Sequence, residues 1–155
     1  MPTLPENAPT LRAYTAADED AAIELWRRSW QAAYPAIDFS ARLAWWRERW
    51  RHELVPTARI TVAETDGSLQ GFVTVDPRTG YLDQIVVAPQ AWGSGVAEAL
   101  LEAAKRISPV LDLKVNKDNA RATRFYEKHG FQISGEDVNE NSGRPVYTMS
   151  WRSMG

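Results

Sequence analysis

The residues best suited to bind a ligand lie in a short turn at positions 92–97, which contains Gly93 and Gly95. An apolar stretch, residues 85–87, precedes the turn, and a helical pattern follows it. Glycine lets the backbone approach a ligand closely and adopt left-handed dihedral angles. The first turn of a helix carries unpaired N–H groups at the positive end of its dipole. The spacing therefore predicts a backbone cradle for a phosphate group.

Other interpretations of the glycine turn must be weighed against this one. A P-loop would end in Gly-Lys-Ser or Gly-Lys-Thr, which is absent here. A dinucleotide-binding turn should follow the first strand of its fold, whereas this turn follows several predicted strands and two predicted helices. An ordinary strand-to-helix loop, with glycines for packing, is a further alternative. The turn alone does not decide between these possibilities.

A second stretch with chemical potential is residues 115–131, which read VNKDNARATRFYEKHGF. Tyr126 within it is protonated at neutral pH, because a phenol has a pKa near ~10. It can therefore donate a proton, although a half-buried tyrosine beside Phe125 could equally serve only to fill the core. Upstream, Asp83 shares one strand face with Ile85 and Val87. Asp83 is a candidate general base, with a solvent-facing carboxylate or a water relay as alternatives.

Together the two stretches strongly resemble the GNAT superfamily of acyl-CoA-dependent N-acetyltransferases, over residues 82–131. The resemblance implies a GNAT-like fold and acetyl-CoA as co-substrate. It also implies that Tyr126 is the general acid and that Asn119 hydrogen-bonds the pantetheine chain. The remaining cofactor-binding residues that it implies are Ile85, Val86 and Val87 along the pantetheine arm, and Trp92, Gly93, Ser94, Gly95, Val96 and Ala97 around the pyrophosphate.

One position departs from the family pattern. The family often has Gln or Arg before the first glycine, where this chain has Trp92, whose indole offers only one N–H donor. An alternative register would start at Gln90 and place the second glycine at Gly95. In the preferred register Trp92 is expected to act as a hydrophobic lid or to pack against the adenine, and the cradle should depend on backbone N–H groups.

The elements that must position these residues alternate in type along the chain. Their order indicates an α/β (α+β) fold with a mainly antiparallel first half and a strand–helix–strand crossover near the middle. The resemblance implies, more specifically, a central, mostly antiparallel, twisted sheet of about seven strands with a parallel, splayed central pair and about four helices. A single domain should span residues 1–155, with a loose tail over 1–9. The expected strands are 10–14, 58–64, 70–75, 81–87, 110–115, 131–138 and 145–151. The expected helices are 15–33, 40–54, 95–108 and 119–129, and Pro56 is expected to stop the second of these.

Composition excludes several classes of chemistry. The chain has 155 residues, a net charge of -2, two histidines and no cysteine. Disulfides, cysteine-ligated metal and a cysteinyl acyl-enzyme are therefore excluded, and a histidine-rich metal site is not expected. Direct transfer in a ternary complex is favoured. We expect no nucleic-acid partner, no membrane span and no secretory signal, and hence a cytoplasmic protein.

The acceptor side is expected in the tryptophan-rich helices near the N-terminus. Trp45 and Trp46 are neighbours, so on a helix they point about 100° apart and cannot both face one core. Tyr34, Trp45 or Trp46 is predicted to contact an apolar part of an amine acceptor, either a small molecule or a peptide. A homodimer is left open. The alternatives to an enzyme are an acyl-CoA sensor without turnover and a nucleotide-binding structural domain.

Overall fold

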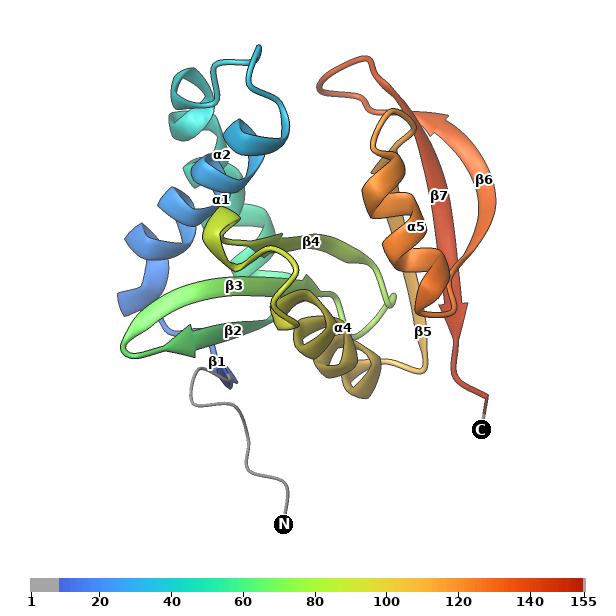
Figure 1. Cartoon of the computed structure of the whole chain (residues 1–155), viewed down its shortest axis with the longest axis horizontal. Coiled ribbons are helices and arrows are strands. Elements are labelled where there is room, and N and C mark those ends of the chain that lie inside the picture. The colour runs from blue at the N-terminus through green and yellow to red at the C-terminus, as the bar shows by residue number, and fades with distance from the viewer. Residues whose placement is uncertain (1–8, 155) are drawn as a thin grey trace.

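A computed structural model describes residues 9–154, in which seven strands form two antiparallel sheets (Figure 1). The loose tail predicted for residues 1–9 lies, apart from Pro9, outside this range. The first sheet has the order β1-β2-β3-β4 and the second has the order β5-β7-β6. The strands are β1 (Thr10–Ala13), β2 (Arg59–Thr65), β3 (Ser68–Val75), β4 (Leu82–Val87), β5 (Val110–Asn116), β6 (Gln132–Val138) and β7 (Pro145–Arg152).

Helices lie between the strands in the predicted order. The main ones are α1 (Glu19–Ala33), α2 (Leu43–Arg49), α3 (Val55–Thr57), α4 (Val96–Ile107) and α5 (Ala120–Lys128). Short helical turns join them: η1 (Ala16–Asp18), η2 (Ser40–Arg42), the wider π-type η3 (Trp50–Leu54) and η4 (Pro89–Ala91). No helix in the described range is both long and apolar enough to cross a bilayer.

The predicted splayed central pair is present as β4 and β5. The two strands meet in one parallel bridge between Tyr81 and Asp112, where the Asp112 N–H donates to the Gly80 carbonyl at 3.0 Å. Beyond this point they diverge, and each sheet continues separately (Figure 1). The seven predicted strands are confirmed, but their hydrogen bonds divide them into two sheets rather than one.

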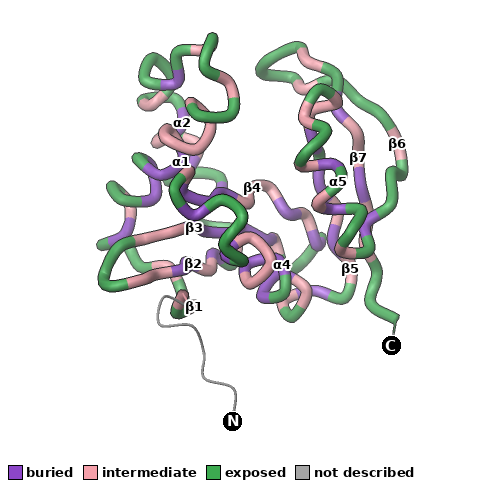
Figure 2. Tube along the Cα trace, viewed as in Figure 1, coloured by how far each residue is buried: buried purple, intermediate pink, exposed green. Residues whose placement is uncertain are grey.

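Helices cover both faces of the first sheet. Since successive residues of β3 point to opposite sides, neighbouring residues of this strand contact different helical layers. Phe72 contacts the Trp50 ring on one side, with centroids 5.1 Å apart. Gly71 faces α4 on the other side, where an added Cβ would lie 2.9 Å from Leu100 and 2.6 Å from the Val86 carbonyl oxygen. Glycine thus allows α4 to approach the sheet closely. Buried residues follow β2, β3 and β4 through the centre of this half (Figure 2).

The second predicted helix, 40–54, ends later than expected. Pro56 was taken as its stop, but the helical path continues through η3 into α3 and ends at Thr57. Pro56 lies in the first turn of α3, where a missing N–H and a fixed φ are tolerated. The π-type turn η3 directly precedes α3, so Pro56 lies at the start of a new helical segment rather than inside the old one.

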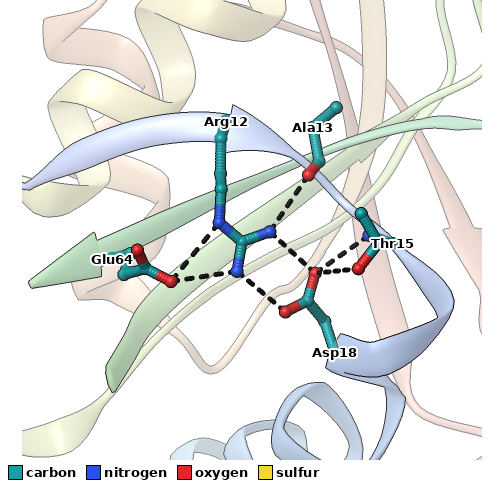
Figure 3. Close-up of polar contacts among 5 residues, drawn as sticks. All are labelled: Arg12, Ala13, Thr15, Asp18 and Glu64. Carbon is teal, nitrogen blue, oxygen red and sulfur yellow. Dashed lines mark hydrogen bonds and ion pairs between the residues drawn. The ribbon is translucent and has the colours of Figure 1, made fainter. Parts of the chain in front are cut away.

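An ion-pair cluster fastens β1 to β2 and to the start of the helical layer (Figure 3). The Arg12 guanidinium donates to both carboxylate oxygens of Asp18 at 2.8 Å and to Glu64 at 2.9 Å. The Thr15 backbone N–H also donates to Asp18, at 2.9 Å. The Arg12 hydrogen bonds lower the pKa of Asp18 from 3.8 to about 2. This cluster supports the fold and lines neither of the cavities described below.

Candidate active site

The glycine turn has the backbone geometry predicted for a cradle. Gly93 and Gly95 have φ angles of 78° and 96°, which favour glycine, and Gly95 is the N-cap of α4. Among the described residues, the N–H groups of Gly93, Gly95, Val96 and Ala97 have no acceptor, whereas the Ser94 N–H donates to the Ala91 carbonyl at 3.2 Å. Four of the five predicted backbone donors are therefore open to an anion.

Trp92 is tied to the end of β4. Its indole N–H donates to the Val87 carbonyl at 2.8 Å, so its single donor is already used. The alternative register through Gln90 has no support, because the Gln90 side chain accepts a hydrogen bond from Arg28 at 2.6 Å and lies outside the cradle cavity. Trp92 therefore anchors the turn to the end of β4, and its indole N–H is not available to a ligand.

A cavity of about 500 Å³ extends from this turn toward α5. It brings together most of the predicted cofactor residues. Alternation along β4 puts Ile85 and Val87 on the cavity side, whereas the Val86 side chain is buried in the core. Val96 is also buried, so its side chain packs in the core while its backbone N–H remains without an acceptor among the described residues. The predicted residues that line the cavity are Tyr34, Ile85, Val87, Trp92, Gly93, Gly95, Ala97, Asn119 and Tyr126.

Asn119 caps α5. Its side-chain oxygen accepts a hydrogen bond from the Ala122 N–H at 3.1 Å, which satisfies one of the open donors of the first turn. The same residue lines the cavity, and its amide N–H₂ has no acceptor among the described residues. Asn119 can thus fix the start of α5 and still offer a donor to a ligand.

A second cavity, of about 450 Å³, lies on the other side of the splayed strands. One wall carries aromatic side chains of α1, α2 and the segment between them, and the other carries β5 and the loop between β6 and β7. The two cavities share five lining residues: Tyr34, Ile85, Asn119, Ala122 and Tyr126. Two molecules, one bound in each cavity, could therefore come into contact beside these shared residues, which form the junction of the cavities.

Tyr126 is at the junction, with only 8% of its surface exposed. Its ring packs against Phe125 and Phe131, with centroids 5.4 and 5.5 Å away. Burial raises the pKa of the Tyr126 phenol above its usual value of 10. Among the described residues its hydroxyl has no hydrogen-bond partner. The phenol is therefore neutral at any working pH and is free to donate.

Asp83 has a different environment from that of a general base. Its carboxylate accepts two hydrogen bonds from the Arg49 guanidinium, at 2.9 and 2.5 Å, and one from the Gln84 amide at 3.1 Å. Its side chain is 13% exposed and lines the second cavity without reaching the junction. Both of its carboxylate oxygens are therefore occupied by protein donors. This geometry argues against the predicted base role of Asp83.

The two neighbouring tryptophans separate as predicted. Trp45 is 45% exposed in the second cavity, whereas Trp46 is 1% exposed and stacks on Trp26, with centroids 4.6 Å apart. Trp46 also lines the cavity, but its large buried surface makes it a core residue. Of the two, Trp45 has the surface available to contact an acceptor.

Tyr34 joins the two halves of the molecule. Its hydroxyl donates to Asp118 at 3.0 Å and accepts from the Asn116 amide at 3.0 Å. The Arg144 guanidinium lies 5.0 Å from the Tyr34 ring and pairs with Asp118 at 3.1 Å. Tyr34 was predicted as an acceptor contact, and this network makes it a bridge between the end of α1 and the second sheet.

Sequence reasoning missed several residues of the two cavities. Arg49 and Arg144 lie outside both motifs, and the cavity partners Asp83 and Asp118 are far from them along the chain. Asn116 lies inside the second motif, but its contact with Tyr34 spans 82 residues. Arg121 lies inside the second motif, one helical turn before Phe125, and lines the first cavity. The i, i+4 spacing between Arg121 and Phe125, which also lines the cavity, could have placed Arg121 beside it. The described residues contain no cluster of three acidic or histidine side chains that could hold a metal ion.

Comparison with known proteins identifies the class. The sequence model of the acetyltransferase (GNAT) family matches residues 19–131, more than half of the chain. The chain therefore belongs to this family. The two antiparallel sheets, the splayed strands and the glycine turn before α4 are all consistent with that membership.

Two curated relatives refine the comparison. The chain is 33% identical over 95 residues to the peptidyl-lysine N-acetyltransferase YjaB of Salmonella typhimurium, covering 60% of this chain and 63% of that protein. It is 33% identical over 101 residues to the peptidyl-lysine N-acetyltransferase YiaC of Escherichia coli, covering 65% and 68%. The matched region thus spans about two thirds of each relative.

Solved structures share the fold over nearly the whole chain. The apo form of YjaB from Escherichia coli has a TM-score of 0.75 at 23% identity, covering 94% of this chain and 98% of that one. The PaiA N-acetyltransferase of Thermoplasma acidophilum, solved in complex with coenzyme A, has a TM-score of 0.74 at 20% identity, covering 94% and 99%. At these identities the likeness concerns the fold alone.

Proposed function

We propose that the protein transfers an acetyl group from acetyl-CoA to an amine by direct attack in a ternary complex. The observation that carries this proposal is the position of Tyr126, a buried neutral phenol that lines both cavities. One cavity begins at a backbone anion cradle, and the other has aromatic walls open to an acceptor. A sensor of acyl-CoA would have no need of a proton donor where the two meet.

Acetyl-CoA fits the first cavity by its chemistry. The pyrophosphate would accept hydrogen bonds from the open N–H groups of Gly93, Gly95, Val96 and Ala97, at the positive end of α4. The pantetheine arm would run along the unpaired edge of β4 past Val87 and Ile85, as an added strand does. The Asn119 amide would donate to the same arm. The thioester would then lie near Tyr126.

The reaction is balanced by two proton movements. A neutral amine attacks the thioester carbonyl, the C–N bond forms, and the oxygen develops negative charge that backbone N–H groups near Val87 can stabilise. The C–S bond then breaks, and the Tyr126 phenol donates to the departing thiolate. The proton lost by the amine nitrogen restores the phenol through solvent. The products are the amide and the free CoA thiol.

A raised phenol pKa shapes the role of Tyr126. A thiol has an ordinary pKa of about 8.5, lower than that of the buried phenol. The phenol therefore first stabilises the CoA thiolate by donating a strong hydrogen bond. The Tyr126 proton moves fully to the sulfur only as the proton released by the amine nitrogen returns to the phenolate. The pKa shift also prevents Tyr126 from acting as the base. With Asp83 paired to Arg49, a water molecule in the second cavity is the better candidate for the base.

The acceptor cavity suits a lysine side chain of a peptide. Its aromatic wall, with Trp45 exposed and Trp30 partly so, would pack against the apolar stem of a lysine. Apolar surroundings also lower the pKa of an amine and so favour the neutral nucleophile. The two curated relatives are both peptidyl-lysine N-acetyltransferases, which makes peptide lysine the first acceptor class to test.

The test measures CoA thiol release with acetyl-CoA and a panel of amines: lysine peptides, polyamines, aminoglycosides and free amino acids. The chain has no cysteine, so a thiol reagent detects only the product. Tyr126→Phe should lower kcat by roughly 10²-fold or more while acetyl-CoA still binds. Tyr147→Phe, which changes a tyrosine outside both cavities, is the matched control and should retain full activity.

Each alternative predicts a different result. If acetyl-CoA binds but no amine in the panel is acetylated, the sensor explanation gains and the enzyme proposal fails. If ATP or NAD raises the melting temperature and CoA does not, the chain is a nucleotide-binding domain. Unchanged turnover in Tyr126→Phe would remove this phenol from the mechanism. Acetylation at peptide N-termini without acetylation at lysine would overturn the acceptor assignment.

A further inference from the structure

The cofactor cavity contains one cationic side chain among its described lining residues, Arg121 in the first turn of α5. Two carboxylates, Glu98 and Asp118, line the same cavity. Asp118 is paired with Arg144 at 3.1 Å, whereas Glu98 has no basic partner within 4 Å in the described range. A dianionic ligand would meet repulsion from Glu98, and a cation in the cavity would offset that repulsion.

Arg121 is held above the glycine turn by an aromatic ring. Its guanidinium carbon lies 5.3 Å from the centroid of the Trp92 ring. The Trp92 N–H is engaged by the Val87 carbonyl, which fixes the plane of the indole and leaves its face available. A guanidinium stacked on an aromatic face keeps its in-plane N–H donors free. In the described residues Arg121 has no carboxylate partner.

We propose that Trp92 and Arg121 form a two-residue phosphate-binding unit, in which Trp92 positions the guanidinium and Arg121 pairs with the pyrophosphate of acyl-CoA. The argument for the pyrophosphate is position, because Trp92 immediately precedes Gly93, whose N–H belongs to the cradle. Cradle and guanidinium would approach the same group from α4 and from α5. The unit would thereby link the two halves of the molecule through the ligand. This inference rests on the proposed use of acyl-CoA.

The test compares Arg121→Ala with Arg124→Ala by calorimetry. Arg124 lies on the same helix, is exposed and lines neither cavity. The Arg124→Ala substitution therefore removes the same charge without removing a side chain from the cavity wall. The probes are CoA and dephospho-CoA, which lacks the 3′-phosphate but keeps the pyrophosphate. Arg121→Ala should weaken both probes by roughly tenfold, the effect of a lost charge-assisted hydrogen bond. Arg124→Ala should weaken neither by more than about twofold.

Two further variants test the positioning role of Trp92. Trp92→Phe keeps an aromatic face but loses the bond to Val87, and Trp92→Leu loses both. Adding Arg121→Ala to Trp92→Leu should cost less affinity than it does in the wild type, because the guanidinium is no longer held in place. In turnover, Arg121→Ala should raise the KM for acetyl-CoA and leave kcat within about twofold, since the proposed contact is with the pyrophosphate and not with the reacting thioester.

Specific results would overturn the inference. Equal affinities for wild type and Arg121→Ala would exclude the contact, and a loss seen with CoA but not with dephospho-CoA would assign Arg121 to the 3′-phosphate instead. Additive losses in the Trp92→Leu double variant would show that the ring does not position the guanidinium. A wild-type protein that binds neither probe would refute the proposed function itself, a result distinct from any of these.

Discussion

The glycine turn allows conformational strain to be separated from ligand binding by two matched substitutions. Gly93 in the cradle and Gly67 in the β2–β3 hairpin have nearly the same φ, 78° and 79°, and an added Cβ at either would meet nothing within 4 Å. Alanine in this left-handed conformation costs about 1–2 kcal/mol. Both Gly93→Ala and Gly67→Ala should therefore lower the melting temperature by a similar, small amount, roughly 2–4 °C per kcal/mol.

Only one of the two substitutions should affect the cofactor. A Cβ at Gly93 adds a methyl group to the wall of the cavity, beside the open N–H groups, and is expected to hinder the approach of the pyrophosphate. At a CoA concentration of 100 times the wild-type Kd, the ligand stabilises the fold by about 2.7 kcal/mol. A tenfold weaker Gly93→Ala would retain about 1.4 kcal/mol under the same conditions, so its CoA-induced thermal shift should be about half as large.

The assay is a thermal melt of each variant with and without CoA. Gly67→Ala should show the full wild-type shift from its lowered starting temperature. The reasoning fails if Gly93→Ala keeps the full shift, or if the two variants differ widely in stability without ligand. The first outcome would place the pyrophosphate elsewhere, and the second would show that the two glycines do not share the same strain.

Three other predictions concern the fold and the acceptor wall. Asp18→Asn should lower the free energy of unfolding by about 2 kcal/mol at neutral pH, because the native pKa of Asp18 is lowered to about 2. In urea unfolding at a series of pH values, the difference in this free energy between wild type and variant should shrink as the pH falls from about 4 to 2. Gly80→Ala should cost more than the Gly93 change, since its Cβ would lie 2.1 Å from the Val110 carbonyl oxygen, and failure to lower the melting temperature would contradict this contact. Trp45→Ala should raise the KM for the acceptor with little effect on stability, whereas Trp46→Ala should cost about 3–5 kcal/mol of folding free energy. The reverse pattern would refute the assignment of Trp45 to the acceptor cavity and of Trp46 to the core.

The sequence was most informative where function and local structure depend on the same residues. The left-handed backbone of Gly93 and Gly95 could be predicted directly, because it depends only on residues within the turn. The pairing of Asp83 with Arg49 depends on a contact 34 residues apart, which no spacing rule predicts. Without that contact, Asp83 was assigned a role as a base. The helix end predicted from Pro56 was wrong, because the effect of a proline depends on whether it lies inside a helix or in its first turn.

The divergence of β4 from β5 gives the free protein four sheet edges instead of two. In addition to the outer strands β1 and β6, the inner strands β4 and β5 each lack a partner on the side that faces the cleft beyond Tyr81. Unpaired edges are templates for foreign extended chains and for aggregation. An acyl-CoA that occupies the gap would cover β4 along its length. Cofactor supply would then govern the colloidal behaviour of the protein as well as its turnover, and cofactor-depleted protein would be the form most prone to self-association.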